Sequence, residues 1–269
     1  MGVPVEDFAT LMTLEPHGSD IFVGLSPDYS WGRVYGGQVI AQGLRAAMAT
    51  VDPDHLVHSV HAYFIRGGNS DEPIRFEVDR IRNGRSFVTR RVVARQSDGA
   101  ILNLSCSFQV VEDQADVQET SLPTDVGEPG SGTNEDWGLL ARRVVHRGDG
   151  RASGWMKVAG PLGDDPILQA CAVAYASDDL ATTAVSTSHP RIGEVDLGNS
   201  TFGDLFIGAS LDHAIWFHRP APADAWQLHE FRSHGLTGGR GLTIGEIFAA
   251  DGTHVATVAQ DVLIRERTR

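Results

Sequence analysis

The chain has only two cysteines in 269 residues, and it has no cluster of lysines and arginines and no apolar stretch of 18 residues. Two cysteines exclude a disulfide scaffold and fit a reducing compartment. Cys106 and Cys171 each stand in an apolar run and are predicted to be buried hydrophobic side chains. A membrane-spanning helix needs about 20 apolar residues. With no basic-then-apolar leader and no peroxisomal ending in "RERTR", we expect a cytoplasmic protein without membrane attachment.

Positive charge is also scarce. The formal net charge is −13, and an acidic chain repels nucleic acid backbones. We therefore expect no nucleic acid partner. A small polyanion is compatible with this balance where a few arginines gather at one site.

One short phrase occurs twice, 153 residues apart. "YFIR" at residues 63–66 and "WFHR" at residues 216–219 share an aromatic residue, phenylalanine, a spacer and arginine. The same offset aligns two Asp-Gly pairs, at Asp98 and Asp251, and each pair divides two strand-like runs. Asp-Gly between such runs is a strong hairpin signal. The chain is therefore predicted to contain two copies of one plan.

Each copy also contains one helix-like segment before the repeated phrase. Residues 36–51 place apolar side chains at helical spacing, and most of their other positions are alanine or glycine. Residues 164–179 begin with aspartate before Pro166, which is tolerated at a first helical position, and continue almost wholly apolar. Both helices are predicted to be buried.

A buried helix wrapped by a curved antiparallel sheet is the hotdog arrangement, so the predicted fold is an α+β double hotdog. The predicted boundaries are an N-terminal unit at 1–111, a linker at 112–135 rich in Pro, Gly, Ser, Thr and acidic residues, and a C-terminal unit at 136–269. A second polar passage, 182–199, makes the later unit longer.

The sequence resembles the TesB-like acyl-CoA thioesterase II family. The matching motifs run in order along nearly the whole chain: "VYGGQVIAQGL" at 34–44, "LVHSVHAYFIRGG" at 56–68, "NGRSFVTRRV" at 83–92, "SCSFQ" at 105–109, "AYASDDL" at 174–180, "SLDHAIWFHRP" at 210–220 and "VATVAQDVLIR" at 255–265. The resemblance implies hydrolysis of fatty acyl-CoA to a free fatty acid and CoA. It also implies association of whole chains into a homo-oligomer and no metal or cofactor.

The resemblance assigns catalytic roles to Asp178, Ser210 and Gln260, which would orient and activate a water. Family members often have threonine where this chain has Ser210, so this chain keeps the hydroxyl but loses the methyl that restricts its rotamer. Asp178 is unusual on physical grounds too, since the C-terminal end of a helix disfavours negative charge. The alternative is that Asp178 and Asp179 simply face water where the helix ends. The resemblance favours the catalytic interpretation for Asp178 only.

Strand alternation predicts that Ser210 and Asp212 share one face and that His213 points to the other, which argues against a Ser-His-Asp triad. Free backbone N–H groups at Gly36 and Gly37, at a helix start, are candidate donors to substrate, with close packing as the alternative.

His58 is a further candidate substrate contact. The histidines offer no shared metal face with other ligands. Four arginines are candidates for the CoA phosphates, although each alone fits a surface salt bridge: Arg66, Arg85, Arg219 and Arg240.

Two other functions are weighed against thioester hydrolysis. Another hotdog enzyme, such as an enoyl-thioester hydratase, would need an Asp/His pair, and the sequence shows no clear signature of one. A non-hydrolytic acyl-CoA binding regulator would be expected to carry a basic DNA-binding domain, which an acidic chain of this length does not contain.

Overall fold

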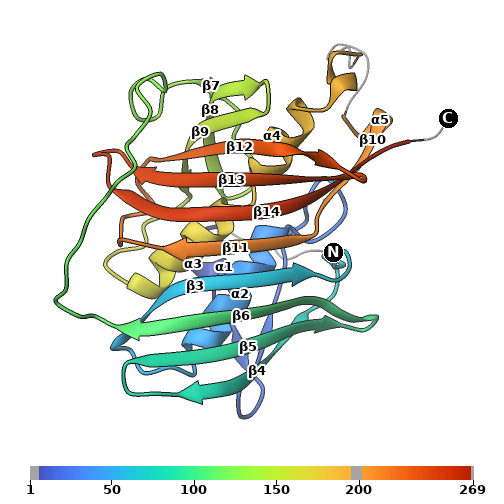
Figure 1. Ribbon diagram of the computed structural model, residues 1–269. Helices are drawn as coiled ribbons and strands as arrows, with labels where there is room; N and C mark the ends of the chain where they lie inside the picture. Colours follow the sequence, from blue (N-terminus) through green and yellow to red (C-terminus); the bar gives the residue numbers. More distant parts are fainter. Residues whose placement is uncertain (1–5, 195–201, 268–269) are drawn as a thin grey trace.

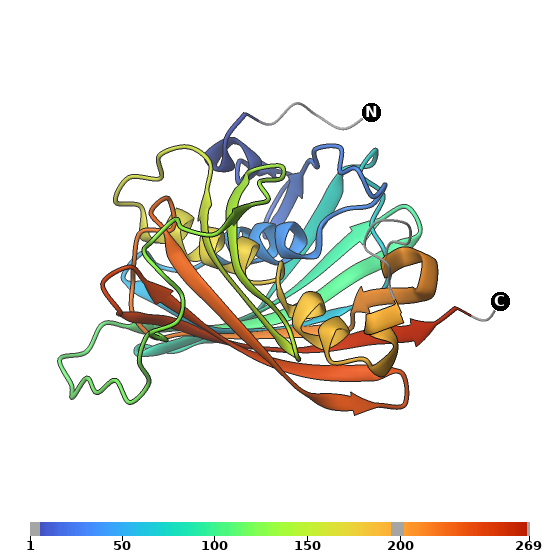
Figure 2. The same ribbon diagram turned by 90° about the horizontal axis from the view of Figure 1, so that it is seen from above.

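A computed structural model of the protein describes residues 6–194 and 202–267. Over these residues the chain forms one 14-stranded antiparallel sheet with helices packed on one of its faces (Figures 1 and 2). The strands of the first half are β1 (Glu15–Pro16), β2 (Ile21–Gly24), β3 (His55–Phe64), β4 (Ile74–Asn83), β5 (Phe87–Gln96) and β6 (Gly99–Val110). Those of the second half are β7 (Thr133–Asn134), β8 (Leu140–Gly148), β9 (Arg151–Val158), β10 (Phe206–Ser210), β11 (Asp212–Phe217), β12 (Gln227–Thr237), β13 (Arg240–Ala249) and β14 (His254–Glu266).

The helices are α1 (Phe8–Leu11), α2 (Gly36–Met48), α3 (Pro166–Ala176), α4 (Ala181–Thr187) and α5 (Phe202–Leu205), with a 3₁₀ turn η1 (Pro190–Glu194). Two of them, α2 and α3, are the predicted central helices, and they pack against each other under the sheet. Asp165 begins α3 by accepting a hydrogen bond from the N–H of Ile167 at 2.9 Å. No helix within 6–194 or 202–267 combines the length and apolar character needed to cross a bilayer.

The repeated phrase forms the centre of the sheet. Strand order runs β1-β2-β4-β5-β6-β3-β11-β14-β13-β12-β9-β8-β7, so the echoed strands β3 and β11 are direct neighbours. They pair antiparallel with His61 opposite Ala214, two positions that differ by the same 153 residues as the repeat. A pseudo-twofold axis therefore passes through this pair. The predicted double hotdog fold is confirmed, and the two units join through a continuous strand ladder.

The two predicted Asp-Gly hairpins are also present. Gly99 opens β6 with φ at 110°, and Gly252 lies between β13 and β14 with φ at 90°. Both values fall in the region that glycine adopts without steric cost. Cys106 and Cys171 are buried and unpaired, as predicted.

The predicted linker has no helix and, before β7, no strand between residues 112 and 132. It is nevertheless held against the second unit. Val126 is 2% exposed and packs with Trp155, whose indole N–H donates to the Val126 carbonyl at 3.0 Å. The Gln118 side chain accepts from the N–H of His254 at 2.9 Å. The segment that connects the two halves therefore also packs over strands of the second unit.

The polar passage predicted at 182–199 differs from expectation over its first part, because α4 occupies Ala181–Thr187. Three threonines weaken the helical signal there. Ala184 and Val185 are fully buried against the sheet, so tertiary packing overrides local propensity. Residues 195–201 of the passage lie outside the described part of the chain.

Candidate active site

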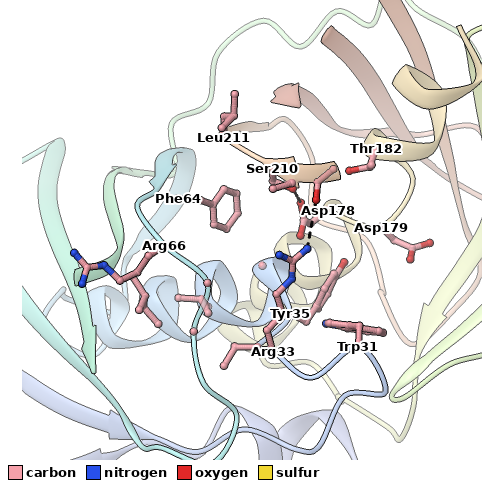
Figure 3. Close-up of a pocket in the computed structure, with 18 of the residues that line it drawn as sticks. Trp31, Arg33, Tyr35, Phe64, Arg66, Asp178, Asp179, Thr182, Ser210 and Leu211 are labelled. Carbon is pink, nitrogen blue, oxygen red and sulfur yellow. Dashed lines mark hydrogen bonds between the residues drawn. The ribbon is translucent and has the colours of Figure 1, made fainter. Parts of the chain in front are cut away.

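A cavity of about 740 Å³ opens where the first turn of α2, the end of α3 and strand β10 meet (Figure 3). Its apolar wall comes largely from the first unit, including Val39, Phe64 and Ile101. The second unit contributes Asp178 and Ser210. The cavity therefore spans the seam between the two hotdog units.

The three residues predicted to act together meet at one edge of this cavity. The hydroxyl of Ser210 donates to Asp178 Oδ1 at 3.0 Å, and Gln260 Nε2 donates to Ser210 Oγ at 2.7 Å. Asp178 follows the C-terminal end of α3, Ser210 ends β10, and Gln260 lies within β14. Gln260 is fully buried and does not line the cavity, whereas Asp178 and Ser210 do. Three distant segments thus place a carboxylate, a hydroxyl and an amide in one hydrogen-bonded row.

The environment of Asp178 favours proton exchange near neutral pH. Burial raises the pKa of Asp178 to about 7, while hydrogen bonds from Ser210, Gln260 and the N–H of Gly37 act in the opposite direction. The negative charge of neighbouring Asp179 raises it further. A general base is most effective when its pKa lies close to the working pH. The carboxylate can therefore exist in either protonation state at physiological pH.

The predicted orientation of Ser210 relative to His213 is wrong, and a β-bulge is the reason. Ser210 pairs with Val262 of β14 and Ala214 pairs with Ala259, so three residues at 211–213 face only two on β14. The extra residue breaks strict alternation and re-aims the side chains beside it. As a result Ser210 and His213 both contact Gln260. They do not contact each other directly, so no Ser-His-Asp triad forms from these neighbours.

The first unit contains the same bulge but not the polar side chains that accompany it in the second unit. In β3 the register with β6 shifts between Val57 and Ser59, which makes His58 the extra residue, 153 positions before Leu211. At this offset Val57 corresponds to Ser210 and Val60 to His213. The duplicated backbone is therefore retained in both units, while the polar row exists only in the second.

His58 does not lie at the cavity, although the sequence analysis named it as a candidate substrate contact. Its ring lies edge-on against Phe87 with centroids 5.9 Å apart, and it is absent from the cavity lining. We assign it no contact with substrate.

Gly36 and Gly37 lie against the carboxylate, and each has a different role there. A Cβ on Gly37 would lie 2.2 Å from the carbonyl oxygen of Tyr175, so glycine allows α2 and α3 to approach closely. The N–H of Gly37 is engaged by Asp178. Gly36 lines the cavity, and a Cβ there would lie 2.5 Å from Asp178 Oδ2. Close packing thus explains Gly37, whose N–H is bound to Asp178 and is not free for substrate, while a donor role for the N–H of Gly36 stays a prediction.

We expect Gly36→Ala to lower kcat on the order of 10²-fold, because the added methyl would displace the Asp178 carboxylate and the ring of Phe64. Thiol release under saturating substrate measures the effect. Gly43→Ala is the matched control in the same helix, since its Cβ would meet side-chain atoms of Leu104 and Leu102, and none of these residues lines the cavity. Unchanged kcat in Gly36→Ala would show that this close approach has no bearing on turnover.

Asp179 does not face water, contrary to the simpler prediction for it. Arg142 Nη1 contacts both of its carboxylate oxygens, at 2.9 and 2.7 Å, and Trp137 donates its indole N–H at 3.0 Å. Arg142 also pairs with Glu135 at 2.9 Å. The sequence analysis missed Arg142 altogether. The sequence offers one clue to this contact: a buried carboxylate needs a cation nearby. That need does not identify which of the 22 lysines and arginines supplies the cation.

The arginines at the cavity also differ from those predicted. Arg66 lines the cavity and its guanidinium donates to the Asp98 carbonyl, while Arg219 and Arg240 are paired with Asp116 and Asp261. Neither these two nor Arg85 lines the cavity. Arg33, which sequence reasoning did not select, lines it beside Arg66, with its side-chain stem close to Gly67.

Within the described ranges, Arg33 and Arg66 form no ion pair with a carboxylate. They are therefore the two cavity arginines whose charge is available to an anion. No histidine contributes to the lining, and within 6–194 and 202–267 no group of three or more His, Cys, Asp or Glu side chains is arranged to hold a metal ion.

Comparison with known proteins gives concordant matches over both halves. Residues 25–109 match a family model described as the acyl-CoA thioesterase N-terminal domain, and residues 112–264 match its C-terminal counterpart. Acyl-CoA thioesterase 2 of Haemophilus influenzae is 33% identical, covering 95% of this chain and 96% of its own length. Human acyl-coenzyme A thioesterase 8 is 29% identical, covering 95% of this chain and 88% of its own. The crystal structure of the acyl-CoA thioesterase II TesB2 from Mycobacterium marinum superposes with a TM-score of 0.80 at 33% identity, covering 97% of this chain and 98% of that one.

Proposed function

The chain belongs to the TesB-like acyl-CoA thioesterase II family and is an acyl-CoA thioester hydrolase, and on that premise we propose that it cleaves fatty acyl-CoA by direct attack of water, giving a free fatty acid and CoA. The observation that carries the proposal is the contact of Ser210 with Asp178 at 3.0 Å at the cavity edge (Figure 3), supported from behind by Gln260, which donates to Ser210 at 2.7 Å. In this proposal Ser210 forms no covalent intermediate, and its hydroxyl, which donates to Asp178, holds the carboxylate and the water in place.

In this proposal Asp178 accepts a proton from the attacking water. A carboxylate offers about four lone-pair sites. The Asp178 carboxylate accepts from three donors: Ser210, Gln260 and the N–H of Gly37. Because Asp178 lines the cavity, we assign the site that is left to the water. General base catalysis of this kind typically contributes about 10²- to 10⁴-fold.

The developing negative charge on the carbonyl oxygen needs a donor, and we assign this role to the N–H of Gly36. The first N–H groups of a helix have no acceptor within the helix. Gly36 begins α2 and lines the cavity. The positive end of the helix dipole adds to the effect. A single oxyanion donor is worth on the order of 10²- to 10³-fold in rate.

The acyl chain and the coenzyme would occupy different parts of the cavity. We propose that the apolar wall of Val39, Phe64 and Ile101 receives the acyl chain, and that Arg33 and Arg66 at the rim receive the CoA phosphates. Guanidinium groups suit phosphate because they donate in a planar fork. Neither charge is compensated by a carboxylate in the described residues. No metal or cofactor is proposed, since carboxylate, hydroxyl, amide and helix N–H supply the required chemistry; turnover should survive treatment with a chelator.

The test is release of free thiol from a panel of acyl-CoA chain lengths, with the acid product identified. We expect thiol and fatty acid in equal amounts. Tight binding of acyl-CoA without thiol release would support the non-hydrolytic binding protein instead. Hydration of an enoyl-CoA without thiol release would support the hydratase, although no histidine lines the cavity beside Asp178.

We further propose that whole chains associate into a homo-oligomer acting in cytoplasmic fatty acid metabolism. The outer face of the central strands exposes Tyr63 at 61% and Trp216 at 38%, close to the pseudo-twofold axis. Exposed aromatic side chains at such a position are typical of a protein interface. Sedimentation equilibrium measures the mass of the assembly directly, and a mass equal to one chain would contradict the proposal.

A further inference from the structure

A second group of polar side chains lies behind Gln260, deeper in the core than Ser210. His213 is 1% exposed and Ser177 and Gln260 are fully buried. His213 Nδ1 faces Gln260 Oε1, and its Nε2 lies 2.8 Å from Ser177 Oγ. None of these three residues lines the cavity. They can affect the reaction only through groups that do.

The hydrogen bonds of this group have one consistent direction. Gln260 donates its Nε2–H to Ser210, so Oε1 is the atom that faces His213. An amide oxygen only accepts, and therefore Nδ1 of His213 carries hydrogen. Burial lowers the pKa of His213 to about 4, so the ring is neutral and Nε2 carries no hydrogen. Nε2 faces the Ser177 hydroxyl, whose one hydrogen is shared between Nε2 at 2.8 Å and the Ala174 carbonyl at 2.9 Å. The donors of His213, Gln260 and Ser210 thus point in turn toward Asp178.

The duplicated fold shows that packing does not require a histidine here. The position corresponding to His213 in the first unit is Val60, which is fully buried in the same kind of strand. The position corresponding to Ser210 is Val57, also buried. The two polar residues therefore occur together in one unit and are replaced together by apolar residues in the other.

We propose that His213 is a positioning residue for thioester hydrolysis: its Nδ1–H fixes the Gln260 amide with the NH₂ group toward Ser210 and Asp178. The inference rests on the proposed function of that site. Without this N–H, the amide is free to rotate by half a turn and present its oxygen to Ser210. The Ser210 hydroxyl would then donate to Gln260 instead of Asp178, and the water site would lose its arrangement.

The test uses His213→Val, the residue that the first unit carries at this place. We expect kcat to fall about 10- to 100-fold with KM within about twofold, since the loss is one of positioning. His213→Asn keeps a side-chain N–H near the place of Nδ1 and is expected to recover kcat to within about fivefold of wild type. His229→Val is the matched control: His229 is equally buried, in β12, and no partner is bound to its Nδ1 in the described residues.

A double-mutant cycle separates positioning from general damage. If His213 acts through Gln260, adding His213→Val to Gln260→Leu should lower kcat no further than Gln260→Leu alone. The proposal is overturned by unchanged kcat in His213→Val, by additive losses in the cycle, or by a folded His213→Asn that recovers nothing. If His213→Val does not fold, Ser177→Ala is measured in its place, and we expect its kcat to be 3- to 10-fold below wild type. Unchanged kcat in Ser177→Ala would also overturn the proposal. In each case wild-type thiol release shows that the proposed function itself stands.

Discussion

Replacement of Asp178 by asparagine is expected to lower kcat for acyl-CoA hydrolysis by about 10³-fold or more, with little change in KM. The amide cannot accept the proton of the water, so both the base contribution and the alignment of the water are lost. Asparagine has nearly the same shape as aspartate, and the apolar wall of Val39, Phe64 and Ile101 is unchanged, so the proposed binding of the acyl chain should be retained. Thiol release at saturating acyl-CoA is the measurement.

Asp164→Asn is a suitable control, because Asp164 is an exposed aspartate near the opposite end of α3. It should retain wild-type kcat. Full turnover by Asp178→Asn would remove the carboxylate from the mechanism and leave the hydroxyl and amide without a base.

The same variant gives a pH signature. In wild type, kcat/KM should fall as pH drops below about 7, since burial raises the pKa of Asp178 to about 7 and only the ionised form is a base. The contribution of Asp178 to stability should show the opposite trend. Between the ordinary aspartate pKa and about 7, the native carboxyl holds a proton that the unfolded chain has released, so the contribution of this group to the unfolding free energy falls as pH rises. Buried His213 and His229, whose pKa values burial lowers, contribute in the opposite direction in both proteins. Urea denaturation at several pH values should therefore show the Asp178 contribution as a difference in slope between wild type and Asp178→Asn.

Replacement of Arg142 by methionine is expected to lower the free energy of unfolding by about 3–5 kcal/mol. Removing one partner of a buried pair leaves the other charge without compensation. The side chain of Asp179 is 7% exposed, and Arg142 Nη1 lies 2.7 Å from its carboxylate. Among the residues that the structure describes, only the Trp137 indole N–H would still donate to it. Urea denaturation at pH 7.5 tests the value.

Arg143→Met is the neighbouring control. Arg143 pairs with Asp136, whose side chain is 46% exposed, and exposed pairs contribute about 1 kcal/mol or less. Combining Arg142→Met with Asp179→Asn should recover part of the loss, because no unpaired buried charge is left. Equal effects of Arg142→Met and Arg143→Met would contradict the buried-pair interpretation.

Sequence reasoning identified the parts of this molecule that follow from local patterns. Helical spacing located α2, Pro166 located the start of α3, and the Asp-Gly pairs located two hairpins. The repeated phrase identified the strands that meet at the centre of the sheet. Asp178, Ser210 and Gln260 came from resemblance to a family, and no periodicity would have joined residues that lie on three elements.

Other features depend on tertiary contacts that no local pattern encodes. The extra residue at 211–213 reverses the expected facing of Ser210 and His213, yet strict alternation gave no sign of it. Helix α4 has a sequence rich in threonine and forms because Val185 is buried by the sheet. Arg142 and Asp179 are 37 residues apart, and only the fold brings them together.

The wall of the cavity and its reactive edge come from different copies of the duplicated unit. Val39, Phe64 and Ile101 belong to the first copy, and Asp178 and Ser210 belong to the second. The earlier copy also places Gly36 and Gly37 against the Asp178 carboxylate, so the reactive edge needs both halves of the polypeptide. Substitutions at Val39, Phe64 or Ile101 are therefore expected to change which acyl groups are accepted, while substitutions at the two glycines are expected to change the rate.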